Sequence, residues 1–314
     1  MLTMKLSQSQ LYRLSIAGRT ASSLSLLGVA TIFTTFTFSE HFRGPTHRIM
    51  LINGFYNLFD FIATMISVSG PEAGDDSALC RFQAFSLQMF PVADVLWTVA
   101  MTWDVVLVVF YHYEPERLRR LEKKYIVVIT TLTFVPAFVF LFIRNAEKGP
   151  LYGSVQFWCS ISPNWVLFRI IFYYAPIWLL ILGVLILYIV IGHELFQLRH
   201  ELMLTSNDCL ALSSRTSPSN ESVRRTNRDD MKDLEGPIIR QQSAVSLRKF
   251  LLMPILYFLA LLATWVAPTI NRVYAFRHPG KEPYPLMMAV ATLGSLRGFW
   301  NGIIFISLRS KARR

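Results

Sequence analysis

The sequence predicts an all-α membrane protein, a bundle of seven transmembrane helices with its N-terminus outside the cell and its C-terminus inside. Three observations support this fold class. The 314-residue chain is 53% hydrophobic and only 16% charged, whereas a soluble domain carries about 25% charged residues. Seven apolar stretches are long enough for the roughly 20 residues that cross the hydrocarbon core. Finally, Lys and Arg collect on alternate connectors between these stretches.

The seven predicted helices span residues 20–39, 49–69, 79–113, 125–143, 165–192, 250–272 and 285–308. The first is the least apolar, because Thr31, Thr34, Thr35 and Thr37 dilute it. The third and fifth are longer than one crossing needs, so we expect them to tilt or to project into water. Membrane β-strands alternate apolar and polar residues over about ten positions, whereas residues 178–191 are apolar almost throughout. This pattern favours helices.

The distribution of basic residues predicts the orientation. Of the 31 Lys and Arg, 20 lie on one set of connectors and 9 on the other, while Arg169 and Arg297 lie inside helices. Cytoplasmic connectors carry the excess of Lys and Arg, so the C-terminus is predicted to be inside. The net charge of +11 would then face anionic lipid of the inner leaflet. We therefore expect membrane lipid, and no nucleic acid, as a partner of this charge.

These patterns divide the chain into five expected segments. They are an extracellular segment (1–19), helices one to five with a cytoplasmic extension of helix five (20–203), a third cytoplasmic loop (204–246), helices six and seven (247–308) and a short cytoplasmic tail (309–314). The 204–246 segment has few large apolar residues, so it is predicted to be disordered. Within it, Ser217 and Ser243 are candidate phosphorylation sites, because Pro218 follows the first and Arg240 precedes the second.

Two cysteines share the outer side in this topology. Cys80 lies at the outer end of the third helix and Cys159 in the second outer connector, where the oxidising environment preserves disulfides. The sequence favours a disulfide between them over two free thiols. Closing a long loop in this way stabilises by roughly 2–4 kcal/mol. Cys209, on the cytoplasmic side, is expected to remain a free thiol.

Ionisable residues at membrane depth cost at least about 2.5–3.5 kcal/mol, so they usually face the bundle interior. Asp94 and Asp104 share one face of the third helix with Phe90, Trp97 and Met101. Either Asp60 or Asp94 could pair with Arg297, and both a switching relay and a static pair remain open. The expected intramembrane polar core comprises Asn57, Asp60, Asp94, Asp104, Arg297 and Asn301.

The chain lacks the usual signatures of catalysis. No HExxH, Walker A or GxSxG motif is present, so we expect no enzyme, cofactor or metal site. The function class that the sequence favours is a receptor. The alternatives are a small-solute transporter or channel that uses the intramembrane Asp and Arg residues, or a membrane scaffold.

Several stretches resemble the cAMP-receptor-like class of G-protein-coupled receptors found in slime moulds and filamentous fungi. They are LCRFQAFSLQMFPVADVLWTVAMTWDVVLVVF, RLRRLEKKY, LYGSVQFWCSI, WVLFRIIFYYAPIW, TWVAPTINRVY and GSLRGFWNGIIF. The resemblance covers all seven helices and fails in the long loop and the tails. It departs from the family at Arg297, where a Gln is expected before the Gly-Phe of the seventh helix.

The resemblance implies a plasma-membrane receptor that senses an extracellular small molecule and activates a heterotrimeric G protein. Cys80 and Cys159 correspond to the family's outer disulfide. The expected G-protein-facing residues, which could equally contact lipid headgroups, are Arg117, Arg119, Arg120, Lys123, Lys124, Arg248 and Lys249. The expected ligand pocket comprises Phe90, Asp94, Trp97, Arg169, Phe172 and Trp265.

The resemblance does not establish cAMP as the ligand, because a phosphate needs cationic partners. The candidate cations toward the outer side are Arg81, Arg144, Lys148, Arg169, Arg272, Arg277 and Lys281.

Overall fold

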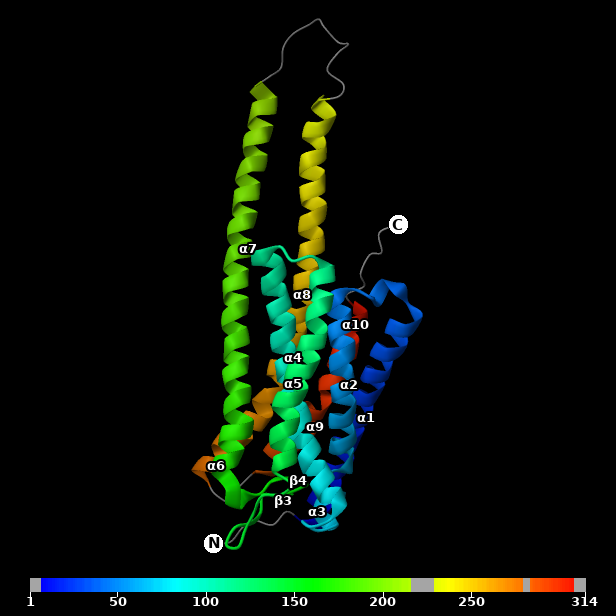
Figure 1. The fold of residues 1–314 in the computed structure, drawn as a ribbon, viewed down its shortest axis with the longest axis vertical. Helices are drawn as coiled ribbons and strands as arrows, with labels where there is room; N and C mark the ends of the chain where they lie inside the picture. The colour runs from blue at the N-terminus through cyan, green and yellow to red at the C-terminus, as the bar shows by residue number, and fades with distance from the viewer. Residues whose placement is uncertain (1–6, 216–228, 279–282, 308–314) are drawn as a thin grey trace, which may run out of the picture.

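The protein is an elongated helical bundle in the computed structural model, which describes residues 7–215, 229–278 and 283–307 (Figure 1). Seven helical spans run along its length. They are α1 (Gln8–Phe38), α2 (Pro45–Ile66), α4 (Ala78–Tyr111), α5 (Pro115–Val139), α6 (Val166–Arg169) continued by the π-helix η3 (Ile170–Tyr174) and α7 (Ala175–Arg215), α8 (Asp229–Arg277), and α9 (Tyr284–Leu293) continued by η4 (Gly294–Leu296) and α10 (Arg297–Ser307). Short helices η1 (Glu40–Phe42), α3 (Ser69–Glu72) and η2 (Pro163–Trp165) lie in the connectors.

Two short antiparallel strand pairs, which the sequence did not predict, close one end of the bundle. Strand β1 (Arg144–Asn145) pairs with β2 (Gly149–Pro150), and β3 (Tyr152–Val155) pairs with β4 (Trp158–Ile161). The β3–β4 hairpin packs against α3 and the first turns of α4. We call this end the hairpin end. We call the opposite end, from which α7 and α8 extend beyond the other helices (Figure 1), the projecting end.

Helix boundaries differ from the predicted ones where local signals extend a helix. Helix α1 begins at Gln8 because Ser7 forms a capping box: its hydroxyl accepts a hydrogen bond from the Gln10 backbone N–H (3.2 Å), and Gln10 accepts one from the Ser7 N–H (3.0 Å). Six described helical spans are long and apolar enough to cross a membrane. Helix α5 is not among them, since its first turns are charged and its uncharged part begins only at Tyr125.

The structure changes the expected boundary of the long loop. Residues 204–215 belong to α7 and residues 229–246 to α8, so helix covers much of the 204–246 segment predicted to be disordered. Residues 216–228 lie outside the described residues. The low apolar content of the 204–246 segment argues against a packed unit of its own. However, adding residues to the end of an existing helix avoids the cost of nucleating a new helix. The two helices can therefore continue beyond the bundle without a core of their own.

Helix α4 occupies the centre of the bundle and packs against α2, α5, α7 and α8. Its interior face contributes Trp97 and Met101, which are at most 2% exposed, to the largest apolar cluster. By contrast, large apolar side chains such as Val127 on α5 and Leu179 on α7 are more than 60% exposed. An apolar exterior around a partly polar interior is typical of a membrane-spanning bundle.

Candidate functional site

An ionic network lies buried between α2, α4, α8 and α10. Arg297, the first residue of α10, forms ion pairs with Asp60 of α2 and with Asp94 of α4 (Nε to Oδ2, 3.2 Å). All three residues are less than 5% exposed. The sequence left open which aspartate would meet Arg297, and in the structure both do.

Three amides and one phenol complete the network. The Asp94 Oδ1 oxygen accepts hydrogen bonds from the side-chain amides of Asn53 (2.7 Å) and Asn57 (2.9 Å). It also accepts a longer one from the Tyr257 hydroxyl (3.4 Å). Asn301 of α10 donates to the same Tyr257 hydroxyl at 2.9 Å. The Asp94 carboxylate thus joins α4 to α2 and α8, and it reaches α10 both directly at Arg297 and through Tyr257.

The backbone around Arg297 explains its position. The 3-10 segment η4 interrupts the last span immediately before Arg297. The Ser25 hydroxyl of α1 donates to the Ser295 carbonyl (2.5 Å) and accepts from the Phe299 N–H (3.2 Å), so α1 supports the interruption from the side. The guanidinium lies over the Phe61 ring at 5.9 Å, in the geometry of a cation–π contact.

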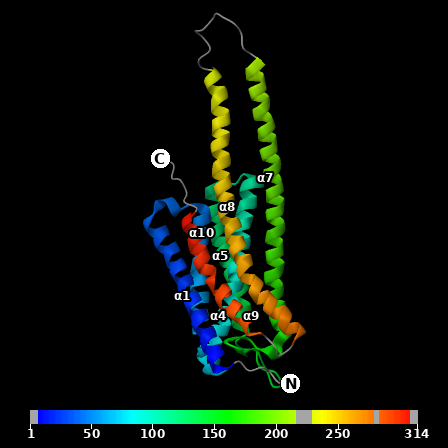
Figure 2. The same cartoon turned by 180° about the vertical axis from the view of Figure 1, so that it is seen from behind.

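Glycines allow α1 and α10 to approach closely, as Figure 2 shows. A Cβ added to Gly28 would lie 2.2 Å from the Gly298 carbonyl oxygen, and one added to Gly302 would lie 2.8 Å from the Gly28 Cα. Larger residues there would separate the two helices and move Arg297. The spacing of four between Gly298 and Gly302 can be seen in the sequence, whereas nothing in the sequence marks Gly28 as their partner.

The network carries two carboxylates and one guanidinium, so its formal charge is −1 when all three are ionised. Several buried acceptors have no hydrogen-bond donor within the described part of the chain: Asp60 Oδ1 and the side-chain carbonyl oxygens of Asn53, Asn57 and Asn301. Such a site is held together only while its charges remain paired. It can therefore favour one helix arrangement strongly over another. Among the described residues, no group of three His, Cys, Asp or Glu side chains could hold a metal ion.

Asp104, the remaining member of the predicted polar core, lies apart from this network. It accepts a hydrogen bond from the Tyr125 hydroxyl of α5 (2.8 Å) toward the projecting end. Nearby, Arg48 of α2 donates to both oxygens of Glu122 at 2.7–3.1 Å. Glu122 is 5% exposed. Its burial was not predicted, because basic residues surround it in the sequence. Its helical spacing from the buried residues Leu118 and Ile129 was the available signal.

The predicted disulfide between Cys80 and Cys159 is present and ties α4 to β4, with 5.3 Å between the Cα atoms. Gln83, one turn further along α4, was not predicted. Its amide donates to the carbonyls of Ala63 (3.2 Å) and Ser67 (3.1 Å), and its oxygen accepts from the Cys159 N–H (2.8 Å). This fully buried side chain joins the end of α2 to the hairpin.

A charged cluster lies on the surface of the hairpin end. Asp76 pairs with Arg81 and Arg144, each at 2.6 Å. The hydrogen bond from Arg81 and the charge of Arg144 lower the pKa of the Asp76 carboxyl below its ordinary value. Next to it, Asp75 accepts hydrogen bonds from the backbone and hydroxyl of Ser154, which attaches the hairpin to the α3–α4 connector.

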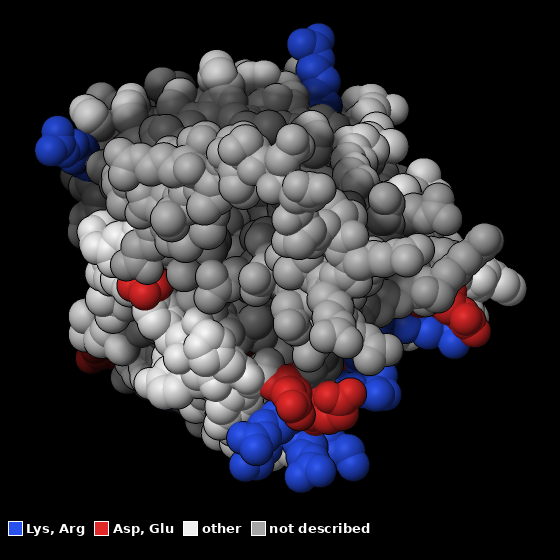
Figure 3. All heavy atoms as spheres, turned by 90° about the horizontal axis from the view of Figure 1, so that it is seen from above, with Lys and Arg blue, Asp and Glu red and all other residues white. Residues whose placement is uncertain are grey.

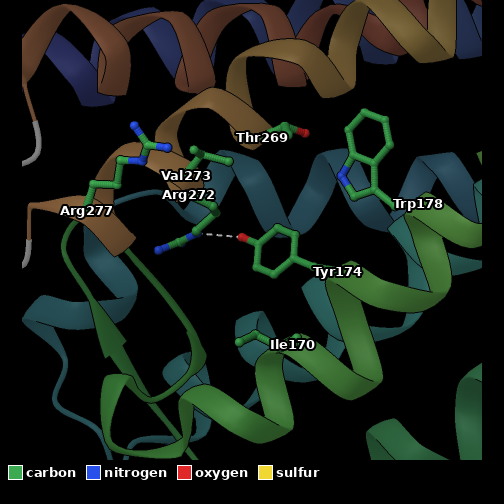
Figure 4. Close-up of a pocket in the computed structure, with 7 residues that line it drawn as sticks. All are labelled: Ile170, Tyr174, Trp178, Thr269, Arg272, Val273 and Arg277. Carbon is green, nitrogen blue, oxygen red and sulfur yellow. Dashed lines mark hydrogen bonds between the residues drawn. The ribbon is translucent and has the colours of Figure 1, made fainter.

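The structure distributes the six predicted pocket residues over separate clusters. Phe90 and Trp97 pack with Asp94 in the bundle centre. Arg169 donates to the Ile161 carbonyl under the hairpin, Phe172 stacks on Phe168 (5.7 Å), and Trp265 packs against Tyr173 (5.9 Å). A cavity of about 490 Å³ lies elsewhere, between the start of the α6–α7 span and the end of α8. It is lined by Ile170, Tyr174, Trp178, Thr269, Arg272, Val273 and Arg277 (Figure 4).

The residues predicted to face a G protein divide between two helices. Those in the first turns of α5, at the projecting end, are all exposed: Arg117, Arg119, Arg120, Lys123 and Lys124. Viewed from this end, Lys and Arg side chains gather at the rim with acidic side chains beside them (Figure 3). Arg248 and Lys249 lie on α8, but their side chains lie outside the described part. Ser217 lies outside the described residues, and Ser243 lies within α8.

Comparison with solved structures identifies the class of fold. The crystal structure of squid rhodopsin superposes with a TM-score of 0.64 and 13% sequence identity, covering 98% of this chain and 86% of that chain. At this identity the likeness shows the fold alone. The predicted seven-helix membrane bundle is therefore confirmed, and the chain is a multi-pass membrane protein with a G-protein-coupled-receptor fold.

The family follows from the sequence itself. The profile of the family described as slime mold cyclic AMP receptor matches residues 6–203, which is more than half of the chain. The chain belongs to this family, as the resemblance predicted, and is a receptor of the G-protein-coupled type. No curated protein matches the sequence.

Proposed function

We propose that the protein is a plasma-membrane receptor that senses an extracellular small molecule and activates a heterotrimeric G protein. The observation that carries the proposal is the buried network in which Arg297 pairs with both Asp60 and Asp94. It joins the helices that would have to rearrange for a signal to cross the bundle. Because breaking a buried ion pair is costly, the network stabilises one arrangement until a ligand favours another.

In this proposal the hairpin end faces outward and the projecting end faces the cytosol. The excess of Lys and Arg on the connectors of the projecting end supports the orientation. The Cys80–Cys159 disulfide supports it too, since disulfides persist on the oxidising side of a membrane. The ligand would bind in the outer half of the bundle and shift the helix arrangement by its differential affinity for the two states.

The signal would leave through the projecting end. Separation of the inner parts of α7 and α8 would expose a surface for the C-terminus of Gα, flanked by the basic first turns of α5. Tyr257 of α8 contacts Asp94 and Asn301, so a change in the network would reach α8 directly. Phosphorylation of Ser243, in the part of α8 that precedes the bundle, would add negative charge at this end. Ser217 remains a second candidate for phosphorylation.

Nucleotide exchange on purified Gα subunits tests the proposal. The full chain in lipid nanodiscs should accelerate GTP binding by at least one of a panel of Gα subunits. Reversing the charge of Arg119 and Arg120 together (R119E/R120E) should abolish this, since both side chains are exposed at the projecting end. The matched control R13E, an exposed arginine on α1 near the hairpin end, should retain it.

Two outcomes would contradict the proposal. The first is that the receptor accelerates GTP binding by no Gα subunit of the panel. The second is that R119E/R120E and R13E change GTP binding equally. Uptake of a small solute into proteoliposomes in the absence of Gα would instead favour a transporter.

A further inference from the structure

The cavity between α6–α7 and α8 has the size of a ligand site and includes two arginines in its described lining. Its volume of about 490 Å³ lies within the roughly 300–1,000 Å³ of small-molecule pockets. Among the described residues that line it, two are arginines and none is acidic, and Ile170, Trp178 and Val273 provide apolar walls. Arg272 and Arg277 both come from the end of α8 (Figure 4).

Tyr174 fixes one of the two cations in place. The Arg272 Nε donates to the Tyr174 hydroxyl at 2.5 Å, and its guanidinium carbon lies 5.7 Å from the centre of the Tyr174 ring. Arg277 is five residues further along α8 in its last turn and is exposed. A helix rises about 1.5 Å per residue, so the positive charge extends along the outer part of the cavity toward the end of α8.

Part of the cavity's lining is apolar and exposed. Val273, which lines it, is 56% exposed, and the neighbouring Ile270 and Ile171 are 52% and 47% exposed. In a membrane-spanning bundle such side chains face acyl chains. The cavity thus combines a cationic end close to the helix terminus with an opening toward the lipid. A soluble anion would meet the cations but would leave the apolar walls without a partner.

We propose that this cavity binds an anionic amphiphile from the bilayer, a molecule with one acyl chain and a carboxylate or phosphate headgroup. The headgroup lies against Arg272 and Arg277, and the chain packs along Ile170, Trp178 and Val273. The guanidinium groups provide paired donors for the oxygens of such a headgroup. The inference rests on the proposed receptor function only for the consequence of binding, since binding itself requires no G protein.

A short aromatic path leads from the cavity into the interior of the bundle. Tyr173 adjoins Tyr174 with 5.1 Å between ring centres, and it packs on Trp265 at 5.9 Å. An occupant that repositions Tyr174 would therefore also act on the Tyr173 ring and, through it, on Trp265.

Photo-crosslinking tests the proposal on the full chain in nanodiscs of neutral phosphatidylcholine, without Gα. The probe is a 16-carbon fatty acid that carries a diazirine. It should label peptides that contain residues 170–178 or Val273. Oleate and oleoyl-lysophosphatidate should compete, whereas the neutral monoolein and the soluble anion cyclic AMP should not.

Three variants make the test specific. R272Q and R277Q each remove a charge-assisted contact and should weaken half-maximal labelling about tenfold or more. V273W fills the cavity without removing charge and should also abolish labelling. R13Q removes an exposed arginine on α1 near the hairpin end and should label like the wild type.

Equal labelling of R272Q, R277Q and the wild type would overturn the proposal. Competition by monoolein as strong as that by oleate would show that the headgroup charge is not recognised, and competition by cyclic AMP would identify a soluble anion instead. Either result would also overturn it. A receptor that is labelled as expected but activates no Gα would leave the site standing and remove the proposed function.

Discussion

The buried pairing of Arg297 makes the sharpest quantitative prediction. The substitution R297Q removes the guanidinium from both Asp60 and Asp94, which are 3% and 0% exposed. Removing one partner of a buried ion pair costs about 3–5 kcal/mol, because the remaining charge stays buried without compensation. For a chain of this size, each kcal/mol lowers the melting temperature by roughly 2 °C. R297Q should therefore melt about 6–10 °C below the wild type.

A double-mutant cycle with D60N isolates the pair from other effects. The double variant D60N/R297Q replaces Asp60 and Arg297 by neutral groups and leaves Asp94 as the one remaining charge of the network. It should therefore be more stable than the sum of the two single effects predicts. Residues in one ion-pair network are typically coupled by about 0.5–3 kcal/mol, which corresponds to roughly 1–6 °C here. The melting temperature is measured on detergent-solubilised protein by the loss of the monodisperse fraction on heating.

The exposed pair of Asp76 and Arg81 is the matched control, because solvent-exposed ion pairs contribute little. Its cycle, D76N and R81Q, should show no measurable coupling. An R297Q protein that melts within about 1 °C of the wild type, or strictly additive effects of D60N and R297Q, would refute the reasoning.

Three further predictions concern stability and are checked by the same thermal assay. C80S, C159S and their combination should lower the melting temperature equally, since each removes the same crosslink between residues 79 positions apart. The expected cost is about 2–5 kcal/mol, and additive losses would argue against the bond. G28A should destabilise the protein, because its Cβ would lie 2.2 Å from the Gly298 carbonyl oxygen. G183A is the control: its Cβ meets nothing within 4 Å, so it should be neutral or stabilising. Equal effects of the two variants would contradict the close approach of α1 and α10. Q83L leaves two carbonyls and one N–H unpaired, so it should cost about 3 kcal/mol, and a wild-type melting temperature would exclude this role.

The sequence predicted those features that depend on composition, topology and helical period. Charge asymmetry placed Cys80 and Cys159 on one side, and the structure joins them. The cost of burying charge directed Asp60, Asp94 and Arg297 to the interior, where the structure pairs them. Neither inference required knowledge of how each helix is rotated about its axis.

Features that depend on helix rotation or on backbone partners could not be predicted. Gln83 bonds to backbone groups, which every residue carries and which therefore leave no pattern. The resemblance led us to expect Phe90 and Trp265 in one pocket, yet the structure packs them in different clusters. The cavity beside Arg272 depends on how the π-helix before α7 packs against the end of α8. The spacing of residues along the sequence does not determine the distance between these two helices.

The orientation of the bundle is the claim on which ligand entry and G-protein contact both depend. Epitope tags placed before Met1 and after Arg314 of the full chain measure it on expressing cells. We predict that antibody labels the N-terminal tag on intact cells and the C-terminal tag only after permeabilisation. Labelling of the C-terminal tag on intact cells would place the basic first turns of α5 outside and contradict the proposed receptor.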